Sequence, residues 1–295
     1  MNTVWANKVL MVRPVRFGWN RETSLDNPHM TEPTEEAQAE ALREFDGLAK
    51  ALTRAGIGVQ VFDDTPEPAT PDSIFPNNWF STHEGGKLVL YPMSQPSRAA
   101  ERKPEIVDWL RAHYPNVVDL TAHETEGRAL EGTGSLVFGL GTGVAFAGLS
   151  ARTDGDLAIG LCGRLGFRPV LFRTMDFDGR PAYHTNILMA LGEGFCLLCE
   201  EAVHPEDRSQ VLDSIASCGV LVALSLDQMR AFTGNGLQLQ GPRGLVFVLS
   251  DRGAAAVRPD QRRAIESKTE IVTAPLDTIE RVAGGSARCM LAELF

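Results

Sequence analysis

The chain has 295 residues, of which 43% are hydrophobic, and its formal net charge at pH 7 is −10. This length supports a sizeable hydrophobic core in one large domain or two small ones. The acidic balance argues against nucleic acids and anionic membrane surfaces as partners, because both reward basic patches. No apolar run approaches the ~20 residues that span a bilayer, and the apolar stretch near the N-terminus is too short for a signal peptide. We therefore expect a cytoplasmic protein without a membrane partner.

Short apolar runs bounded by Gly, Pro or charged residues predict β-strands along the whole chain. The predicted strands are KVLMVRP (8–14), GVQVFD (58–63), KLVLYPM (87–93), SLVFGL (135–140), RPVLFRT (168–174), NILMALG (186–192), GFCLLC (194–199), VLVALS (220–225), LVFVLS (245–250) and EIVTA (270–274).

Between several of these runs, apolar residues recur at helical spacing. The clearest predicted helix runs from Thr34 to Ala55, with Ala37, Ala41, Phe45, Leu48 and Leu52 on one face. It opens after a proline with acidic residues in its first turn, as the helix dipole prefers. Weaker helical patterns cover Glu101–His113, Asp154–Leu165, Pro205–Ser217 and Arg258–Ser267.

No linker or low-complexity segment divides this alternation of strands and helices. The β-rich units recur about every 50–60 residues, without the sequence identity that would define repeats. We therefore predict a single α/β domain over residues 1–295 that contains many short strands. Neither GxGxxG nor GxxxxGK[ST] occurs, so the sequence does not support nucleotide chemistry.

The chain contains five cysteines, and this odd number in a long chain does not indicate a disulfide framework. Cys196 and Cys199 form a CxxC motif, which is compatible with a zinc or redox site. A zinc site normally needs a second ligand pair at comparable spacing, and the sequence nearby has none. We interpret the two residues as small apolar side chains of a buried strand and predict no metal site.

Two polar stretches in the first half of the chain are not required by the strand pattern. In DSIFPNNWFSTH (72–83), Asn77 and Asn78 follow Pro76 and precede Trp79. They indicate either a turn, where Asn and Pro are common, or amides placed for a ligand. In ALEGTGSLVF (129–138), Glu131 precedes a glycine pair at the entrance to a strand, as an exposed loop carboxylate or as a site residue.

Two further stretches lie in the second half. In YHTNILMALG (183–192), His184 and Asn186 alternate at period two, so we expect both on one face of a strand. A lone histidine before an apolar strand is more often structural, whereas a His–Asn pair on one face is a better site candidate. In AGGSARCM (283–290), Cys289 follows Gly284 and Gly285 near the C-terminus, as a buried core residue or as a reactive thiol.

Together these residues make a plausible nucleophilic site. A cysteine attacks as thiolate, and its free pKa of about 8.5 leaves it mostly protonated at neutral pH. We expect His184 to lower the pKa of Cys289 and to shuttle protons. Glu131 is available to orient a cationic substrate, and the two glycines would let the backbone approach that substrate closely.

The order of the four motifs, FPNNW, LEGTGS, YHTN and GGSARCM, resembles the pentein superfamily of guanidine-modifying enzymes. That superfamily includes arginine deiminase, agmatine deiminase, dimethylarginine dimethylaminohydrolase, succinylarginine dihydrolase and arginine amidinotransferase. The resemblance runs from about Val9 to the C-terminus. It is strongest to the branch of arginine dihydrolases and citrulline-utilisation hydrolases, described as amidinotransferase-like or arginine deiminase-related. It implies a five-bladed α/β propeller of pseudo-repeated ββαβ units around a central polar channel.

The resemblance also implies residue roles. Cys289 would be the nucleophile, His184 the general acid and base, and Glu131 the carboxylate that contacts the terminal nitrogens of the substrate. The implied substrate contacts are Asn20, Asn78, Arg98 and Asn186. Arg98 would pair with the α-carboxylate, unless it is a surface helix arginine. No metal or organic cofactor is implied, the ligand is a guanidino or ureido amino acid, and the oligomeric state stays open, a homo-oligomer included.

The chain departs from arginine deiminases at two positions. Those enzymes carry Asp where Asn78 and Asn186 stand, and the two acids clamp the guanidinium cation. An amide both donates and accepts, which suits a neutral ureido group. Each lost charge-assisted hydrogen bond should weaken cation binding by roughly 1.5–3 kcal/mol. Succinylarginine dihydrolases are similar in having Asn at both positions. A further departure is Ala283, where relatives often have a third glycine.

We therefore predict a hydrolase that handles a citrulline-like species, as substrate or as an intermediate that it hydrolyses again. Alternatives within the enzyme class are arginine deiminase, dimethylarginine dimethylaminohydrolase and amidinotransferase. From another class, the chain could be a catalytically dead pentein that acts as a binding module. The intact set of Cys289, His184 and Glu131 argues against this last alternative.

Overall fold

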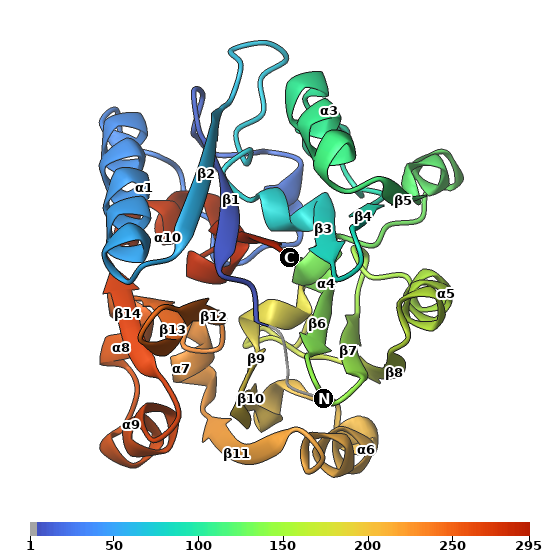
Figure 1. Cartoon of the computed structure of the whole chain (residues 1–295), viewed down its shortest axis with the longest axis vertical. Helices are drawn as coiled ribbons and strands as arrows, with labels where there is room; N and C mark the ends of the chain where they lie inside the picture. Colours follow the sequence, from blue (N-terminus) through green and yellow to red (C-terminus); the bar gives the residue numbers. More distant parts are fainter. Residues whose placement is uncertain (1–4) are drawn as a thin grey trace.

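The computed structural model describes residues 5–295 and contains five three-stranded sheets arranged around a common centre (Figure 1). In four of them the first strand pairs antiparallel with the second, which pairs parallel with the third. These sheets are β3 (Phe80–His83), β4 (Lys87–Leu90) and β5 (Asn116–Asp119); β6 (Leu136–Gly139), β7 (Val144–Leu149) and β8 (Arg168–Arg173); β9 (Met189–Gly192), β10 (Gly194–Cys199) and β11 (Gly219–Leu224); β12 (Leu237–Gly241), β13 (Gly244–Ser250) and β14 (Glu270–Ala274).

The fifth sheet joins the two ends of the chain. β15 (Ala292–Leu294) pairs antiparallel with β1 (Lys8–Arg13), with Lys8 opposite Leu294, and β1 pairs parallel with β2 (Gly58–Asp63). The C-terminal strand thus supplies the first strand of the ββαβ unit that the N-terminal segment begins. This ring of five units confirms the five-bladed α/β propeller that the sequence predicted.

A helix connects the second and third strands of every blade, because parallel strands need a crossover connection. The crossover helices are α1 (Ala37–Arg54), α3 (Pro104–His113), α5 (Gly155–Leu165), α6 (Pro205–Ile215) and α9 (Pro259–Glu266). They lie at the periphery of the ring in Figure 1, with the sheets between them and the centre. The predicted apolar face of α1 is buried, and each of its large side chains contributes roughly 1.5–3 kcal/mol.

Short helices and turns fill the remaining connections, both within and between blades. They are α2 (Pro96–Ala99), α4 (Gly132–Ser135), α7 (Leu226–Arg230), α8 (Asp251–Ala255) and α10 (Asp277–Ala283), with the 3-10 turns η1 (Thr23–Leu25), η2 (Pro76–Asn78), η3 (Thr121–Glu126), η4 (Thr185–Ile187), η5 (Glu200–Ala202) and η6 (Ala287–Met290). Within residues 5–295, no helix is long and apolar enough to cross a membrane.

All ten predicted strands and all five predicted helices occur, and β2, β10 and β14 have the predicted ends while the others are shifted. Five strands were missed, for physical reasons that differ. β12 is rich in glutamine, β3 has the polar sequence FSTH, and β7 contains Ala and Gly, which have low strand propensity. β5 is mostly exposed and β15 has three residues, so neither shows a clear pattern.

One prediction about local structure is wrong. His184 and Asn186 do not alternate along a strand, because His184 caps η4 and Asn186 lies within it, before β9 begins. Similar one-turn segments precede the first strand of other blades: η2 before β3, α4 before β6 and η6 before β15. Each such turn carries polar side chains to the centre of the ring, where strands alone would have placed apolar ones.

Candidate active site

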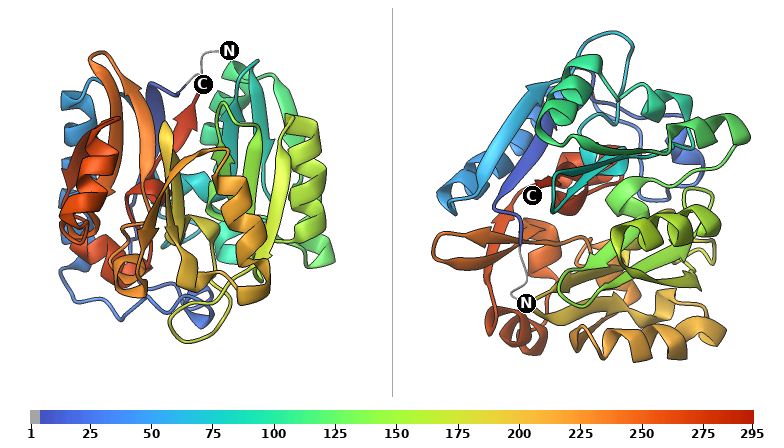
Figure 2. Two further views of the ribbon diagram at one scale, coloured as in Figure 1. Left: turned by 90° about the horizontal axis from the view of Figure 1, so that it is seen from below. Right: turned by 45° about the vertical axis from the view of Figure 1, so that its right-hand side comes forward.

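The structure gathers the predicted site residues into one connected cluster. Cys289, His184, Asn78 and Arg98 line a single pocket, together with residues of the 14–36 loop such as Thr23 and Asn27. Asn186, Glu131 and Asn20 each hydrogen-bond to a residue that lines it. Seen from below in Figure 2, the 14–36 loop (blue) lies at the opposite end of the ring from both termini. The pocket therefore opens toward that loop.

Cys289 lies in η6 with 3% of its surface exposed. Its Sγ accepts a hydrogen bond from Asn235 Nδ2 at 3.3 Å, and a longer one from Asn186 Nδ2 at 3.7 Å. Burial raises the pKa of the thiol, although the Ser286 backbone and both amides lower it in part. Among residues 5–295, no hydrogen bond links Sγ to His184. The expectation that His184 lowers the thiol pKa therefore stays a prediction, and the ring hydrogen-bonds to another partner.

That partner is Glu131, whose side chain is fully buried. His184 Nε2 lies 2.9 Å from Glu131 Oε2, and Arg152 Nη1 lies 3.6 Å from the same oxygen. The other carboxylate oxygen accepts the Ser94 backbone N–H at 3.0 Å. Burial alone would raise the pKa of Glu131, but Arg152 and His184 outweigh it and hold that pKa far below its usual range. Glu131 is thus an anion that fixes the ring of His184.

The pKa of His184 is lowered by burial, with contributions from the cations of Arg152 and Arg98, even though Glu131 acts in the opposite direction. Burial and the two cations therefore favour the neutral imidazole. Glu131 does not line the pocket, and both of its oxygens are engaged. Its expected contact with the terminal nitrogens of the substrate stays a prediction, which would have to be made beside the contact with His184.

Arg98 is a buried arginine and not a surface one, with 2% of its surface exposed. Its Nε and Nη2 contact the two carboxylate oxygens of Glu101 at 2.6 and 3.2 Å, and Nη2 also donates to Asn78 Oδ1 at 2.9 Å. Burial lowers the pKa of Arg98, but Glu101 and Asp72 outweigh this and hold it above its usual range. Asn78 itself lies in the 3-10 turn that Pro76 opens, which confirms the turn interpretation of this stretch, while its role toward a ligand stays a prediction.

Asn20 is buried, but its side chain faces the protein and not the pocket. Nδ2 donates to Asp72 Oδ2 at 2.9 Å and to Ser97 Oγ at 3.0 Å, and Oδ1 accepts the Glu22 N–H at 3.1 Å. These three bonds use most of the capacity of the amide. Asn20 therefore anchors the 14–36 loop, and the prediction that it contacts substrate is not supported by this geometry.

Three residues of the site were missed by the sequence reasoning. Asp72 lines the pocket, and its Oδ2 accepts a hydrogen bond from Thr23 Oγ1 at 2.9 Å. Its Oδ1 is buried and has no hydrogen-bond partner among residues 5–295. Arg152 lines it too and donates from Nε to Asp26 Oδ2 at 2.9 Å, which ties the loop to Glu131. Asn235 lies closest to the sulfur. Its signal was available, since TGNGLQLQ places an amide just before a blade's first strand.

The glycines of the cysteine loop serve the fold as well as the pocket. Gly284 ends α10 in a left-handed conformation with φ 64°, where a Cβ would lie 2.5 Å from Asn27 Nδ2. A Cβ on Gly285 would lie 2.7 Å from the ring of Phe75. Ala283 is still helical, so the absence of a glycine there does not affect the turn. All three residues line the pocket.

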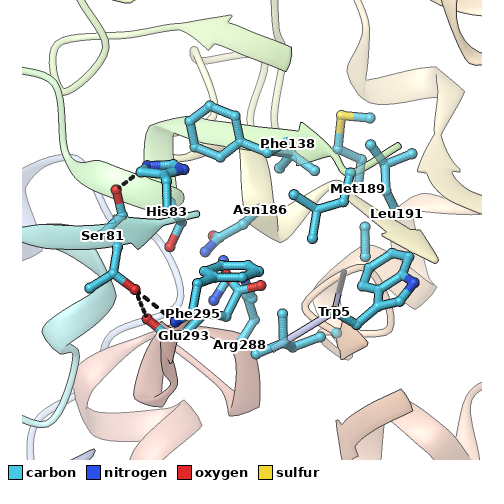
Figure 3. Close-up of a pocket in the computed structure, with 17 residues that line it drawn as sticks. Trp5, Ser81, His83, Phe138, Asn186, Met189, Leu191, Arg288, Glu293 and Phe295 are labelled. Carbon is cyan, nitrogen blue, oxygen red and sulfur yellow. Dashed lines mark hydrogen bonds and ion pairs between the residues drawn. The ribbon is translucent and has the colours of Figure 1, made fainter. Parts of the chain in front are cut away.

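A second pocket lies on the other side of η6, the turn that carries Cys289 (Figure 3). Asn186 and Arg288 line it, and Arg288 donates to Glu293 at 2.8 Å, while Ser81 and His83 are hydrogen-bonded at 2.8 Å. The first strand of every blade contributes to its wall. The two pockets are separated near the axis by the turn that carries Cys289.

The surroundings of Gly134 show how tightly the site is packed. A Cβ there would lie 2.6 Å from Asn78 Nδ2 and 2.8 Å from His184 Nδ1. Neither side chain can move away from the added Cβ. The Asn78 amide is hydrogen-bonded to Arg98, and the His184 ring is hydrogen-bonded to Glu131. We expect G134A to lower kcat/KM by roughly 100-fold, since small displacements of positioned groups cost that much. Steady-state kinetics with a thermal melt would check this.

The matched control is G163A, on the exposed face of α5, where a Cβ would meet nothing within 4 Å. It should leave kcat/KM unchanged and stabilise the fold by about 0.4–1 kcal/mol. Equal kinetics for G134A and G163A would contradict the packing around Asn78 and His184.

Comparisons with known proteins agree with this architecture. A family model described as N,N-dimethylarginine dimethylhydrolase, eukaryotic, matches residues 13–295. No curated protein sequence matches the chain. Among solved structures, the N-terminal domain of ArgZ, described as an arginine dihydrolase from the ornithine–ammonia cycle in cyanobacteria, is 18% identical with a TM-score of 0.78, covering 98% of this chain and 97% of that one.

Two further structures are similar in fold. Unliganded AgrE is 18% identical with a TM-score of 0.79, and the match covers 98% of this chain but 39% of AgrE. DDAH from Pseudomonas aeruginosa, a cysteine-to-serine mutant complexed with citrulline, is 16% identical with a TM-score of 0.71, and the match covers 99% of this chain and 100% of that one. At these identities the likeness establishes the fold.

Proposed function

Because the chain belongs to the N,N-dimethylarginine dimethylhydrolase family, and through it to the pentein superfamily, we propose that it is a cysteine hydrolase of guanidino or ureido C–N bonds. The observation that carries the proposal is a single pocket lined by Cys289 and by His184, with His184 fixed by the buried anion Glu131. In this proposal the chain acts as one catalytic domain on a small amino acid.

The first half of the reaction forms a covalent intermediate. Cys289 gives its proton to the neutral ring of His184, and the sulfur attacks the central carbon of the guanidino or ureido group. His184 then donates that proton to the departing nitrogen, which leaves as ammonia. The product is an S-alkylthiouronium from arginine or a thiocarbamate from citrulline. Since Sγ and His184 are not hydrogen-bonded in the ligand-free protein, this first proton transfer would require the two side chains to approach each other when substrate binds.

The second half releases the product. Neutral His184 takes a proton from water, the resulting hydroxide attacks the same carbon, and the C–S bond breaks. His184 then returns its proton to the sulfur, which restores the thiol and the neutral ring. Arginine would give citrulline. Citrulline would give a carbamate that loses CO2 to leave ornithine. The proposal requires no metal or organic cofactor, because the nucleophile, the proton carrier and the positioning groups all belong to the chain.

The neutral amides of Asn78 and Asn186 favour a citrulline-like species, as substrate or as the intermediate of a dihydrolase. Both residues are buried and lie at the reacting sulfur or in the pocket that it lines. The name of the matching family model favours a second candidate, hydrolysis of N-methylated arginine with release of a methylamine. Single-cycle deimination of arginine is a third candidate.

Product stoichiometry distinguishes these reactions. The protein is incubated separately with arginine, citrulline and asymmetric dimethylarginine, and ammonia, methylamines, citrulline and ornithine are measured per substrate consumed. We expect two ammonia and one ornithine from arginine, and one ammonia with one ornithine from citrulline. Citrulline accumulating with one ammonia would indicate a deiminase, and dimethylamine would indicate the dimethylarginine reaction. No release from any substrate would favour a non-catalytic binding module.

A further inference from the structure

The orientation of the Asn78 amide is fixed by its hydrogen bond with Arg98. Arg98 Nη2 lies 2.9 Å from Asn78 Oδ1, and a guanidinium has only donors, so the amide must present its oxygen to Arg98. The amide nitrogen, Nδ2, therefore points the other way. An aspartate at this position would have presented oxygens in both directions.

Arg98 is itself held in place. Its contacts with Glu101 at 2.6 and 3.2 Å are made between two buried side chains, with 2% and 1% exposed, and Nη2 also donates to the Phe75 carbonyl at 3.4 Å. Two parallel bonds to one carboxylate define the plane of the guanidinium. The guanidinium of Arg98, which orients Asn78, is thus held in a buried ion pair with Glu101.

The free side of Asn78 faces the reacting centre. Its Nδ2 is buried and has no hydrogen-bond partner among residues 5–295. A Cβ added at Gly134 would lie 2.6 Å from this nitrogen and 2.8 Å from His184 Nδ1, so the two nitrogens lie close to each other beside Gly134. Asn78 and His184 both line the pocket with Cys289. A buried donor without an acceptor is unfavourable, so a ligand that supplies an acceptor gains binding energy there.

We propose that Arg98 is a positioning residue for substrate selection, which turns the amide of Asn78 so that the pocket accepts a terminal group carrying a hydrogen-bond acceptor. A ureido group has such an acceptor in its carbonyl oxygen, whereas the end of a guanidinium has N–H donors alone. The unpartnered Oδ1 of Asp72 in the same pocket remains for an N–H of the ligand. This inference rests on the proposed function and assigns Arg98 a role beyond the α-carboxylate contact expected from the sequence.

The test compares two ligands that differ only at the terminal group. Binding of citrulline and arginine is measured by calorimetry in the C289A background, where neither is turned over. The variant R98M/E101M removes the buried pair as a unit, because removing one charge would leave the other unpaired. With its anchor gone, Asn78 can rotate and present oxygen. We expect the preference for citrulline over arginine to fall about tenfold, the value of one matched against one mismatched hydrogen bond.

The matched control is K103M/D64M, which removes another buried ion pair of the same region that does not line the pocket. It should leave the ratio of the two dissociation constants unchanged. A loss of an α-carboxylate contact would weaken both ligands equally, because both carry that group. Equal weakening in R98M/E101M would therefore overturn the inference.

A second variant keeps the test decisive if the double variant does not fold. N78D retains Arg98 and places an oxygen where Nδ2 was, so it should shift the preference toward arginine by roughly tenfold or more. An unchanged ratio in N78D overturns the inference alone. Failure of both amino acids to bind C289A, together with no ammonia release by the wild-type protein, overturns the proposed function and this inference with it.

Discussion

Replacing Cys289 by alanine is expected to lower ammonia release on the order of 10⁴–10⁶-fold, the usual consequence of removing a nucleophile. The other cysteines lie outside the pocket, so none can replace it. The sulfur makes only weak contacts with Asn186 and Asn235, at 3.3 Å or longer. The fold should therefore survive. Ammonia release, a thermal melt and intact-mass detection of the substrate adduct in the wild-type protein would check this prediction.

The matched control is C162A, which removes a buried free thiol from α5. It should keep full turnover and lose about 1 kcal/mol of stability, as typical substitutions do. Appreciable turnover by C289A, or a substrate adduct that forms on C289A, would show that another group is the nucleophile. Loss of activity in both variants would point to a general effect of removing buried thiols.

Replacing Glu131 by glutamine is expected to lower kcat by roughly 10³–10⁴-fold, by analogy with the loss of the carboxylate that orients a catalytic histidine. Glutamine keeps the size of the side chain but offers both a donor and an acceptor to His184 Nε2, so the ring no longer has one defined tautomer. The anion that opposes the lowering of the His184 pKa is also lost.

The pH profile separates this effect from simple damage. In the wild-type protein Glu131 raises the pKa of His184, so removing it should move the His184 limb of the kcat profile to lower pH. The control E124Q alters a carboxylate that binds Arg102 and the Met93 N–H away from the pocket, and its profile should not move. An E131Q profile that keeps its shape while kcat falls would contradict the role of Glu131 in tuning His184.

Glu131 also links acidity to stability. The pKa of Glu131 is far below its usual 4.5 in the folded protein. Its contribution to the free energy of unfolding is therefore complete above pH 4.5 and is lost progressively as the pH falls below 4.5. E131Q cannot lose this contribution on acidification, and its melting temperature should therefore fall less steeply below pH 4.5 than that of the wild-type protein.

Much of the fold was predictable because each element carries its own local pattern. The stripe of Ala37, Phe45 and Leu52 predicts α1, and apolar runs between turn residues predict strands such as β1, β10 and β13, which are mostly buried. Strands such as β5 and β15 could not be predicted, since they exist through pairing with β4 and β1 and not through their own composition.

The candidate site was predictable in part. Cys289, His184 and Asn78 stand in short motifs with unusual polar residues, and all three line one pocket. Arg152 was not predictable from any local pattern. It belongs to the site because it reaches Asp26 across 126 residues and lies beside Glu131, and such contacts are made only when the ring of blades closes.

What the sequence by itself determined is which chemical groups are available: a thiol near the C-terminus, a histidine, a carboxylate, and amides where relatives carry acids. Chemical identity is local, so residue types suffice to infer it. What only the tertiary structure decided is how those groups are directed. It directs Glu131 to His184, Asn20 to Asp72 and Arg98 to Asn78. Direction depends on contacts between blades, and these arise because β15 closes the propeller against β1 and brings Cys289 to the centre.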